Sequence, residues 1–292
     1  GSAQPYSKAI LSHLGTRERY GAMVVPYFNN TDHLVLNEGA IGIPGVTLTN
    51  MPDDFIHSTD DDFNQVDPTQ LKRNAFIAAA STWYLANADD KEVPTIASEV
   101  YHAGLKRINQ DALAANYHIL RNKDGEPEVA YKEARNLIEQ AFDREKRALE
   151  SCRVFAQQTK SRLQIDNLKK NLGDQLRGTA ERLDEFFATT TGKPLPELTL
   201  TQKERELSKK IPINNPDLVE YFAKRTRIQG MHGEMQYEVL NFVNGKNSYL
   251  DIFKAVQAEA MSAGEFYYGV VKLEDVEKLL DKNVETKAIS LK

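Results

Sequence analysis

Helical periodicity in the middle of the chain limits the available folds more than any other feature of the sequence. Between about residues 93 and 187, prolines are rare and apolar residues recur with a helical period. The clearest run consists of Leu168, Leu172, Leu176, Ala180, Leu183 and Phe187, at spacings of 4, 4, 4, 3 and 4. We therefore predict about three long amphipathic helices packed together. A coiled coil is the alternative, although the period is too irregular for sustained heptads.

The N-terminal segment, residues 3–90, mixes strand-like and helical patterns. The apolar runs at 21–28 (GAMVVPYF) and 46–50 (VTLTN) predict strands. Asp67 and Pro68 predict the start of a helix, because aspartate caps a helix and proline suits its first position. That helix is apolar around much of its circumference, so we expect it to be buried. We expect burial at Leu71, Phe76, Ala79 and Trp83.

The C-terminal segment, residues 212–292, follows a linker at 191–211 that contains glycine and prolines. Its pattern predicts a helix, a turn at Asn244-Gly245-Lys246, a second helix, a short strand near residues 267–271 and a final helix. This order is typical of a small helix-turn-helix or winged-helix-like module. We expect this module to dock through exposed aromatic residues, namely Tyr249, Phe266, Tyr267 and Tyr268.

The predicted fold class follows from these segments. Residues 3–90 form an α/β fragment with a partial mixed sheet and helices. Residues 91–190 form a mainly α-helical region, and the small winged-helix-like module closes the chain.

Net charge and the length of the apolar runs indicate which kinds of partner this chain can bind. The formal net charge of −5 gives no general attraction to nucleic acid or to anionic membrane. The basic residues are scattered and interrupted by acidic ones, so they form no contiguous face for phosphates. No apolar run approaches the ~20 residues that cross a bilayer. We therefore expect no nucleic acid and no membrane among its partners, while a homo-oligomer stays open.

A single histidine lies in the acidic stretch DDFIHSTDDDFNQVDP, residues 53–68. Neutral imidazole is a common zinc ligand, and a nearby carboxylate can orient its ring. His57 could therefore be a metal ligand. The alternative is a surface-loop histidine beside aspartates that cap a helix, and this stretch alone favours the loop.

A longer series of motifs resembles the closing segment of the zinc exopeptidases of peptidase family M twenty-eight. It covers about residues 20–88 and consists of Thr31-Asp32-His33, Gly42-Ile43-Pro44, Ile56-His57 and the aspartates from Asp60 to Asp67 before a final helix. The resemblance implies an α/β domain with a mixed central sheet. It also implies hydrolysis of N-terminal peptide bonds by two zinc ions that activate a water.

The resemblance also implies roles for individual residues. His57 would be the last metal ligand in chain order. Asp32 and His33 could line the cleft that takes the peptide substrate, or they could simply form and cap a turn.

Other parts of the family pattern are missing. A His-x-Asp motif, a Glu-Glu pair holding the general base and a further aspartate ligand should precede Gly21, and residues 1–20 contain none of them. A catalytic zinc takes about three protein ligands, so one histidine cannot hold it. We therefore expect this chain to carry no catalytic residue, to bind no zinc tightly and to be inactive by itself.

Two hypotheses of different classes remain. The first is the C-terminal segment of a zinc-dependent aminopeptidase-like hydrolase, whose missing N-terminal half is its partner. The alternative is a non-catalytic helical protein-interaction module. We interpret Gly1-Ser2 as the remnant of a cleaved expression tag. The resemblance favours a secreted or periplasmic bacterial protein with a signal peptide further upstream.

Overall fold

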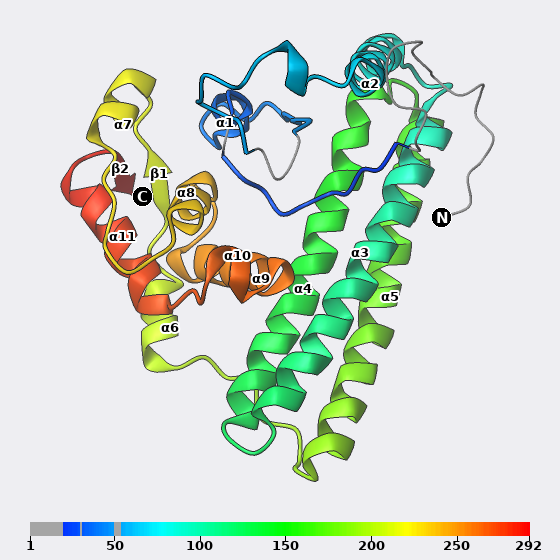
Figure 1. Cartoon of the computed structure of the whole chain (residues 1–292). Helices are drawn as coiled ribbons and strands as arrows, with labels where there is room; N and C mark the ends of the chain where they lie inside the picture. Colours follow the sequence, from blue (N-terminus) through cyan, green and yellow to red (C-terminus); the bar gives the residue numbers. More distant parts are fainter. Residues whose placement is uncertain (1–19, 30, 50–53) are drawn as a thin grey trace. The chain divides into compact units, whose positions relative to one another are not determined.

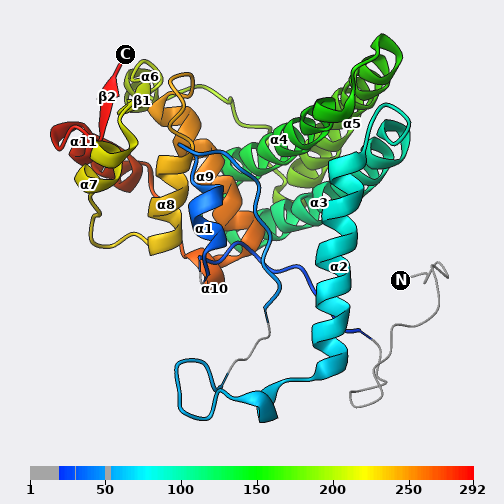
Figure 2. The same cartoon turned by 90° about the horizontal axis from the view of Figure 1, so that it is seen from above.

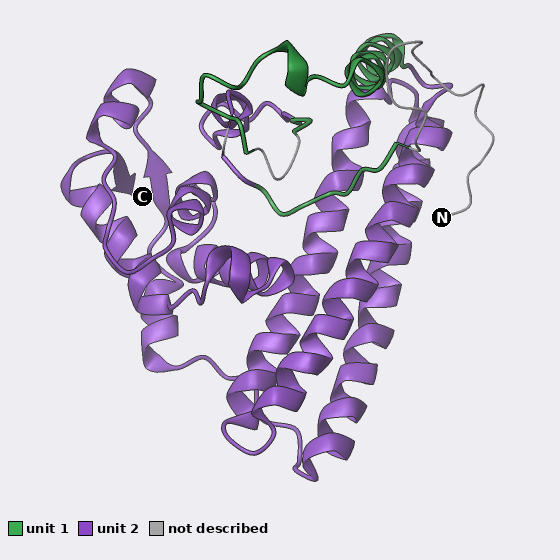
Figure 3. Ribbon diagram, in the orientation of Figure 1, with its two compact units in different colours: residues 1–27, 46–88 green, residues 28–45, 89–292 purple. Residues whose placement is uncertain are grey.

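The computed structural model describes residues 20–29, 31–49 and 54–292, and helices dominate these residues (Figure 1). The chain divides into two compact units (Figure 3). Unit 1 comprises residues 1–27 and 46–88, and unit 2 comprises residues 28–45 and 89–292. Gly1-Ser2 and the last residue of the predicted strand at 46–50 lie outside the described residues. The prediction of a mainly α-helical region after the N-terminal segment is confirmed.

Three long helices form the first half of unit 2: α3 (Val93–Asn122), α4 (Pro127–Ser151) and α5 (Thr159–Thr191). They run side by side in both views (Figures 1 and 2). Their apolar stripes meet in one core, whose fully buried side chains include Ile119, Phe142, Leu172 and Phe187. The helical bundle predicted from the apolar period is therefore confirmed.

Local signals set the ends of these helices. α3 ends and α4 begins around the polar turn at residues 121–128, and both α3 and α4 carry proline in their first turn. A short 3₁₀ helix, η2 (Cys152–Phe155), follows α4. α5 ends at Gly192, whose φ of +67° is a left-handed conformation that glycine adopts without strain.

The rest of unit 2 is a set of shorter elements around a second apolar core. These are α6 (Gln202–Leu207), β1 (Pro212–Asn214), α7 (Leu218–Lys224), α8 (Gly233–Asn241), α9 (Tyr249–Ala263), α10 (Glu265–Tyr268), α11 (Leu273–Glu285) and β2 (Ile289–Leu291). β1 and β2 pair antiparallel, with Ile213 opposite Ser290. The two strands bring the start and the end of this region together.

The predicted helix, turn and helix correspond to α8, the loop at residues 244–247 and α9. Gly245 has φ +72°, as the tight turn requires, and the final helix α11 is also present. The predicted short strand near residues 267–271 is wrong. The first part of that segment belongs to α10, which is followed by Gly269 with φ +68°, and the residues after it pair with no described strand.

The contact between α9 and α4 joins the C-terminal region to the bundle. Asn136 on α4 donates to the backbone oxygen of Lys254 at 2.8 Å, and Gln257 donates to Glu133 at 3.1 Å. The prediction of docking through aromatic residues is wrong for Tyr249 and Tyr268, which are buried in the second core. Tyrosine rings supply large apolar area, so a small module needs them for its own interior.

Unit 1 contains η1 (Phe63–Gln65) and α2 (Pro68–Asn87). The predicted start of α2 is confirmed, because the Asp67 carboxylate accepts from the backbone N–H of Thr69 at 2.8 Å and of Gln70 at 3.2 Å. The predicted burial of Leu71, Phe76, Ala79 and Trp83 is wrong, since all four are exposed.

The two predicted strands of the N-terminal segment are absent from the described residues. Residues 20–29 and 43–49 adopt no regular secondary structure. A strand is stable only when a neighbouring strand pairs its backbone N–H and C=O groups. The apolar runs at 21–28 and 46–49 have no such neighbour in the described part of the chain.

Candidate functional site

The Thr31-Asp32-His33 triplet lies at the start of α1 (His33–Asn37) in unit 2. Asp32 occupies the N-cap position, but its side chain accepts no hydrogen bond from the helix. Thr31 Oγ1 lies 2.7 Å from Nδ1 of His33, so the hydroxyl and the ring orient each other. The Asp32 carboxylate is exposed to solvent and takes no part in capping α1.

The Gly42-Ile43-Pro44 turn folds back on α1. Gly42 has φ +70°, and its N–H donates to the backbone oxygen of Glu38 at 2.7 Å. The amide of Asn37 holds Gly45 from both sides, accepting from its N–H at 2.6 Å and donating to its C=O at 3.2 Å. The turn and the helix therefore form one small substructure.

His57 lies in an exposed loop of unit 1 and adopts φ +62°, a conformation that is uncommon for residues other than glycine. The turn is held by Ser58, whose hydroxyl donates to the backbone oxygen of Phe55 at 2.6 Å. Two of the following aspartates act as caps. Asp62 caps η1 by accepting from the N–H of Asn64, and Asp67 caps α2.

These residues do not make up a zinc centre. In the described part of the chain, no group of three or more His, Cys, Asp or Glu side chains is arranged to hold a metal ion. The predicted ligand His57 belongs to unit 1, whereas Asp32 and His33 belong to unit 2.

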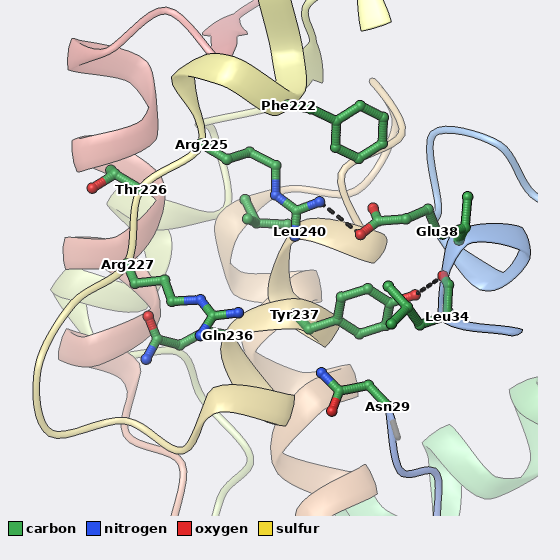
Figure 4. A pocket seen from close by; sticks show the side chains of 11 residues that line it. Asn29, Leu34, Glu38, Phe222, Arg225, Thr226, Arg227, Gln236, Tyr237 and Leu240 are labelled. Carbon is green, nitrogen blue, oxygen red and sulfur yellow. Dashed lines mark hydrogen bonds and ion pairs between the residues drawn. The ribbon is translucent and has the colours of Figure 1, made fainter. Parts of the chain in front are cut away.

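A cavity of about 400 Å³ lies in unit 2 between α1 and the α7–α8 region (Figure 4). Glu38, at the end of α1, is 3% exposed, and its Oε1 accepts from Nη1 of Arg225 at 2.6 Å. Tyr237 on α8 donates its hydroxyl to the backbone oxygen of Leu34 at 3.0 Å. A third contact, from the N–H of Gly39 to Asn241 at 2.8 Å, completes the link between α1 and α8.

Two glutamates on α8 and α9 have raised pKa values. Removal from water, together with the nearby Glu259 carboxylate, raises the pKa of Glu238 on α8 to about 8. Removal from water raises the pKa of Glu259 on α9 to about 7, against the opposing charges of Arg144 and Arg147. These groups change charge near neutral pH, unlike ordinary glutamates.

A charged network connects α3, α4 and α9. Glu145 is 2% exposed; Arg107 donates to both of its oxygens, at 2.6 and 2.9 Å, and Arg144 donates to Oε1 at 2.7 Å. Burial alone would raise the pKa of Glu145, but these hydrogen bonds hold it below its ordinary value. Arg144 and Ser262 both donate to Asp111, so the network also anchors the end of α9.

Sequence reasoning missed Glu38, Arg225 and Tyr237 as residues of a cavity. Glu38 and Arg225 are 187 positions apart, and no local period or spacing connects them. The sequence offered only a weak signal for this cavity. Glu38 follows a short apolar helix, and Arg225 lies two positions from Arg227.

Comparison with known proteins adds no relative, since no family model, no curated protein and no solved structure matches this chain. Among the helices that the structure describes, none combines the length and apolar character needed to cross a membrane.

Proposed function

We propose that this chain is the C-terminal segment of a zinc-dependent aminopeptidase-like hydrolase of peptidase family M twenty-eight, which cleaves N-terminal peptide bonds in the parent protein. The order of the motifs supports this: Thr31-Asp32-His33, then Gly42-Ile43-Pro44, then His57, then a capped helix from Pro68. In the parent, we expect an α/β domain, then the bundle of α3, α4 and α5, and then a winged-helix-like module.

The observation that carries the proposal is the apolar surface of α2. At ~100° per residue, its large apolar side chains lie in pairs on three faces separated by about 100–150°. The pairs are Leu71 with Leu85, Phe76 with Trp83, and Ile77 with Tyr84, and all six are between 36% and 70% exposed. Packing against a single neighbouring element covers about one face of a helix. A helix that is apolar on all sides is typical of the interior of a larger domain.

The unpaired runs beside α2 support the same proposal. Met23 and Val24 are 83% and 101% exposed, although their sequence is typical of a buried strand. Additional strands from an N-terminal half would pair these backbones and cover these side chains. That half is the partner we propose for unit 1.

The chemistry of the parent is implied by the family resemblance. Two zinc ions would activate a water for attack on the peptide carbonyl. His57 would be one ligand, and Asp32 and His33 would line the cleft. The described residues alone do not fit a zinc pair, so the remaining ligands and the general base would come from the N-terminal half.

The test uses the protein encoded by the complete gene, beside the 292-residue chain. We expect the parent to bind about two zinc ions and to hydrolyse aminoacyl-p-nitroanilides, and we expect the isolated chain to do neither. In the parent, His57→Ala should lower kcat/KM by roughly 100-fold or more and reduce the zinc content. His102→Ala is the matched control, because His102 is an exposed histidine on α3 outside the motif series.

Two results would contradict the proposal. One is zinc-dependent turnover by the isolated chain. The other is a parent whose His57→Ala variant keeps both its zinc and its kcat.

A second candidate function, a non-catalytic protein-interaction module, is supported by a stripe on α3. Leu113, Tyr117 and Leu120 are spaced as one helical face and are 54%, 51% and 39% exposed. If the parent neither binds zinc nor hydrolyses the substrates, substitutions in this stripe are the first test for a protein-interaction surface.

A further inference from the structure

We infer that the cavity between α1 and the α7–α8 region of unit 2 binds a small zwitterion that carries both an ammonium and a carboxylate, such as a free α-amino acid or a dipeptide. The inference does not rest on the peptidase proposal. It concerns a different set of residues, all within unit 2, and its test measures binding and not hydrolysis.

The size and the walls of the cavity suit a small organic ligand. Its volume of about 400 Å³ falls in the lower part of the range for ligand pockets, roughly 300–1,000 Å³. Leu34, Val35, Phe222 and Leu240 supply apolar walls, and charged groups stand among them (Figure 4). Apolar walls with a few polar groups are the usual composition of such sites.

Glu38 supplies an acceptor that the protein leaves unused. Its Oε1 accepts from Arg225, but its Oε2 is buried and has no hydrogen-bond partner among the described residues. A buried carboxylate oxygen without a donor carries a desolvation cost. A ligand ammonium, with three N–H donors and a positive charge, would remove that cost.

Two guanidinium groups supply the opposite charge. Arg225 is held in orientation by its bond to Glu38 and by the rings of Tyr221 and Phe222, whose centroids lie 5.3 and 5.6 Å from its Cζ. Arg227 is exposed, lines the same cavity and donates no side-chain hydrogen bond to any described residue. Guanidinium groups bind carboxylates through two parallel N–H donors.

The balance of these charges selects a zwitterion over a simple ion. The lining contains two arginines and one glutamate. An anion alone would leave Glu38 Oε2 without a donor and would meet its negative charge. A cation alone would meet two guanidinium groups. A ligand with both charges meets each requirement, and an aliphatic side chain would fit the apolar walls.

One further polar lining group, the side-chain amide of Gln236, is already engaged within the protein and does not compete for the ligand. Gln236 donates to the backbone oxygens of Ile228 and Met231 and accepts from the N–H of Ile228. Recognition therefore depends on the glutamate and the two arginines.

Isothermal titration calorimetry on the 292-residue chain tests the inference with four probes: leucine, Leu-Leu, N-acetylleucine and leucinamide. N-acetylation removes the ammonium, and amidation removes the carboxylate. We expect leucine or Leu-Leu to bind and both single-charge analogues to bind at least tenfold more weakly.

Variants then assign the contacts. Glu38→Gln keeps the shape of the side chain and removes its charge, and Arg227→Gln removes the guanidinium of an exposed residue whose side chain donates no hydrogen bond to any described residue. Each should weaken binding of the zwitterion at least tenfold, whereas the control Lys224→Gln, which pairs with Glu220 on α7, should not. Circular dichroism checks that each variant is folded.

Three results would overturn the inference. The first is no detectable binding of leucine or Leu-Leu at millimolar concentration. The second is N-acetylleucine or leucinamide binding as tightly as leucine. The third is unchanged affinity in the folded Arg227→Gln variant.

Discussion

Replacing Gly104 with alanine is a sharp test of the packing between α3 and α4. Alanine in the middle of a helix normally adds about 1 kcal/mol of stability relative to glycine. At Gly104, however, an added Cβ would lie 2.8 Å from Oε2 and 3.2 Å from Cδ of Glu145. That carboxylate cannot move away freely, because Arg107 and Arg144 both bind it.

The change in the free energy of unfolding is the difference between the cost of displacing the Glu145 carboxylate and the helical gain from alanine. Removing one partner of a buried ion pair costs about 3–5 kcal/mol. Here the carboxylate is displaced and not removed, and the Arg107 side chain is 47% exposed, so we expect a cost of about 2–3 kcal/mol. After subtracting the helical gain, Gly104→Ala should lower the free energy of unfolding by about 1–2 kcal/mol.

The matched control is Gly173→Ala on α5. Gly173 also lies inside a long helix, but an added Cβ there meets no atom within 4 Å. This variant should gain about 0.5–1 kcal/mol. Urea unfolding followed by far-ultraviolet circular dichroism measures both changes, and the double variant Gly104→Ala, Glu145→Ala should show less than the sum of the two single losses. A Gly104→Ala variant as stable as the wild type, or more so, would refute the reasoning.

Two further predictions concern the C-terminal region. Glu238→Gln should stabilise the protein at pH 8 and have little effect near pH 5. The raised pKa of Glu238 means that the folded state keeps a proton which the unfolded state releases above its ordinary value of 4.5, so stability falls as the pH rises toward about 8. Urea unfolding at both pH values tests this against the exposed control Glu181→Gln, and an effect independent of pH would contradict it. Ser248→Ala should lower the stability by about 1 kcal/mol, because Ser248 and Asp251 form a capping box at the start of α9. An unchanged thermal midpoint would show that this cap contributes nothing.

The candidate site illustrates what local patterns cannot supply. The pair Glu38 and Arg225 depends on the approach of α1 to the end of α7 and to α8, through contacts between residues about 200 positions apart. Neither residue has a periodic or motif signal of its own. Likewise, the raised pKa values of Glu238 and Glu259 come from removal from water in the folded chain, which composition does not report.

Local sequence patterns were enough to predict the features that arise within a few turns of chain. The apolar period predicted α3, α4 and α5, Asp67-Pro68 predicted the start of α2, and Asn244-Gly245-Lys246 predicted the turn before α9. Each depends on hydrogen bonds or side-chain spacing between near neighbours, so each can be read locally. The remaining features come from contacts between distant parts of the chain. Strand pairing, the exposure of α2 and the burial of Tyr249 and Tyr268 depend on which distant surfaces meet, and a linear pattern carries no such information.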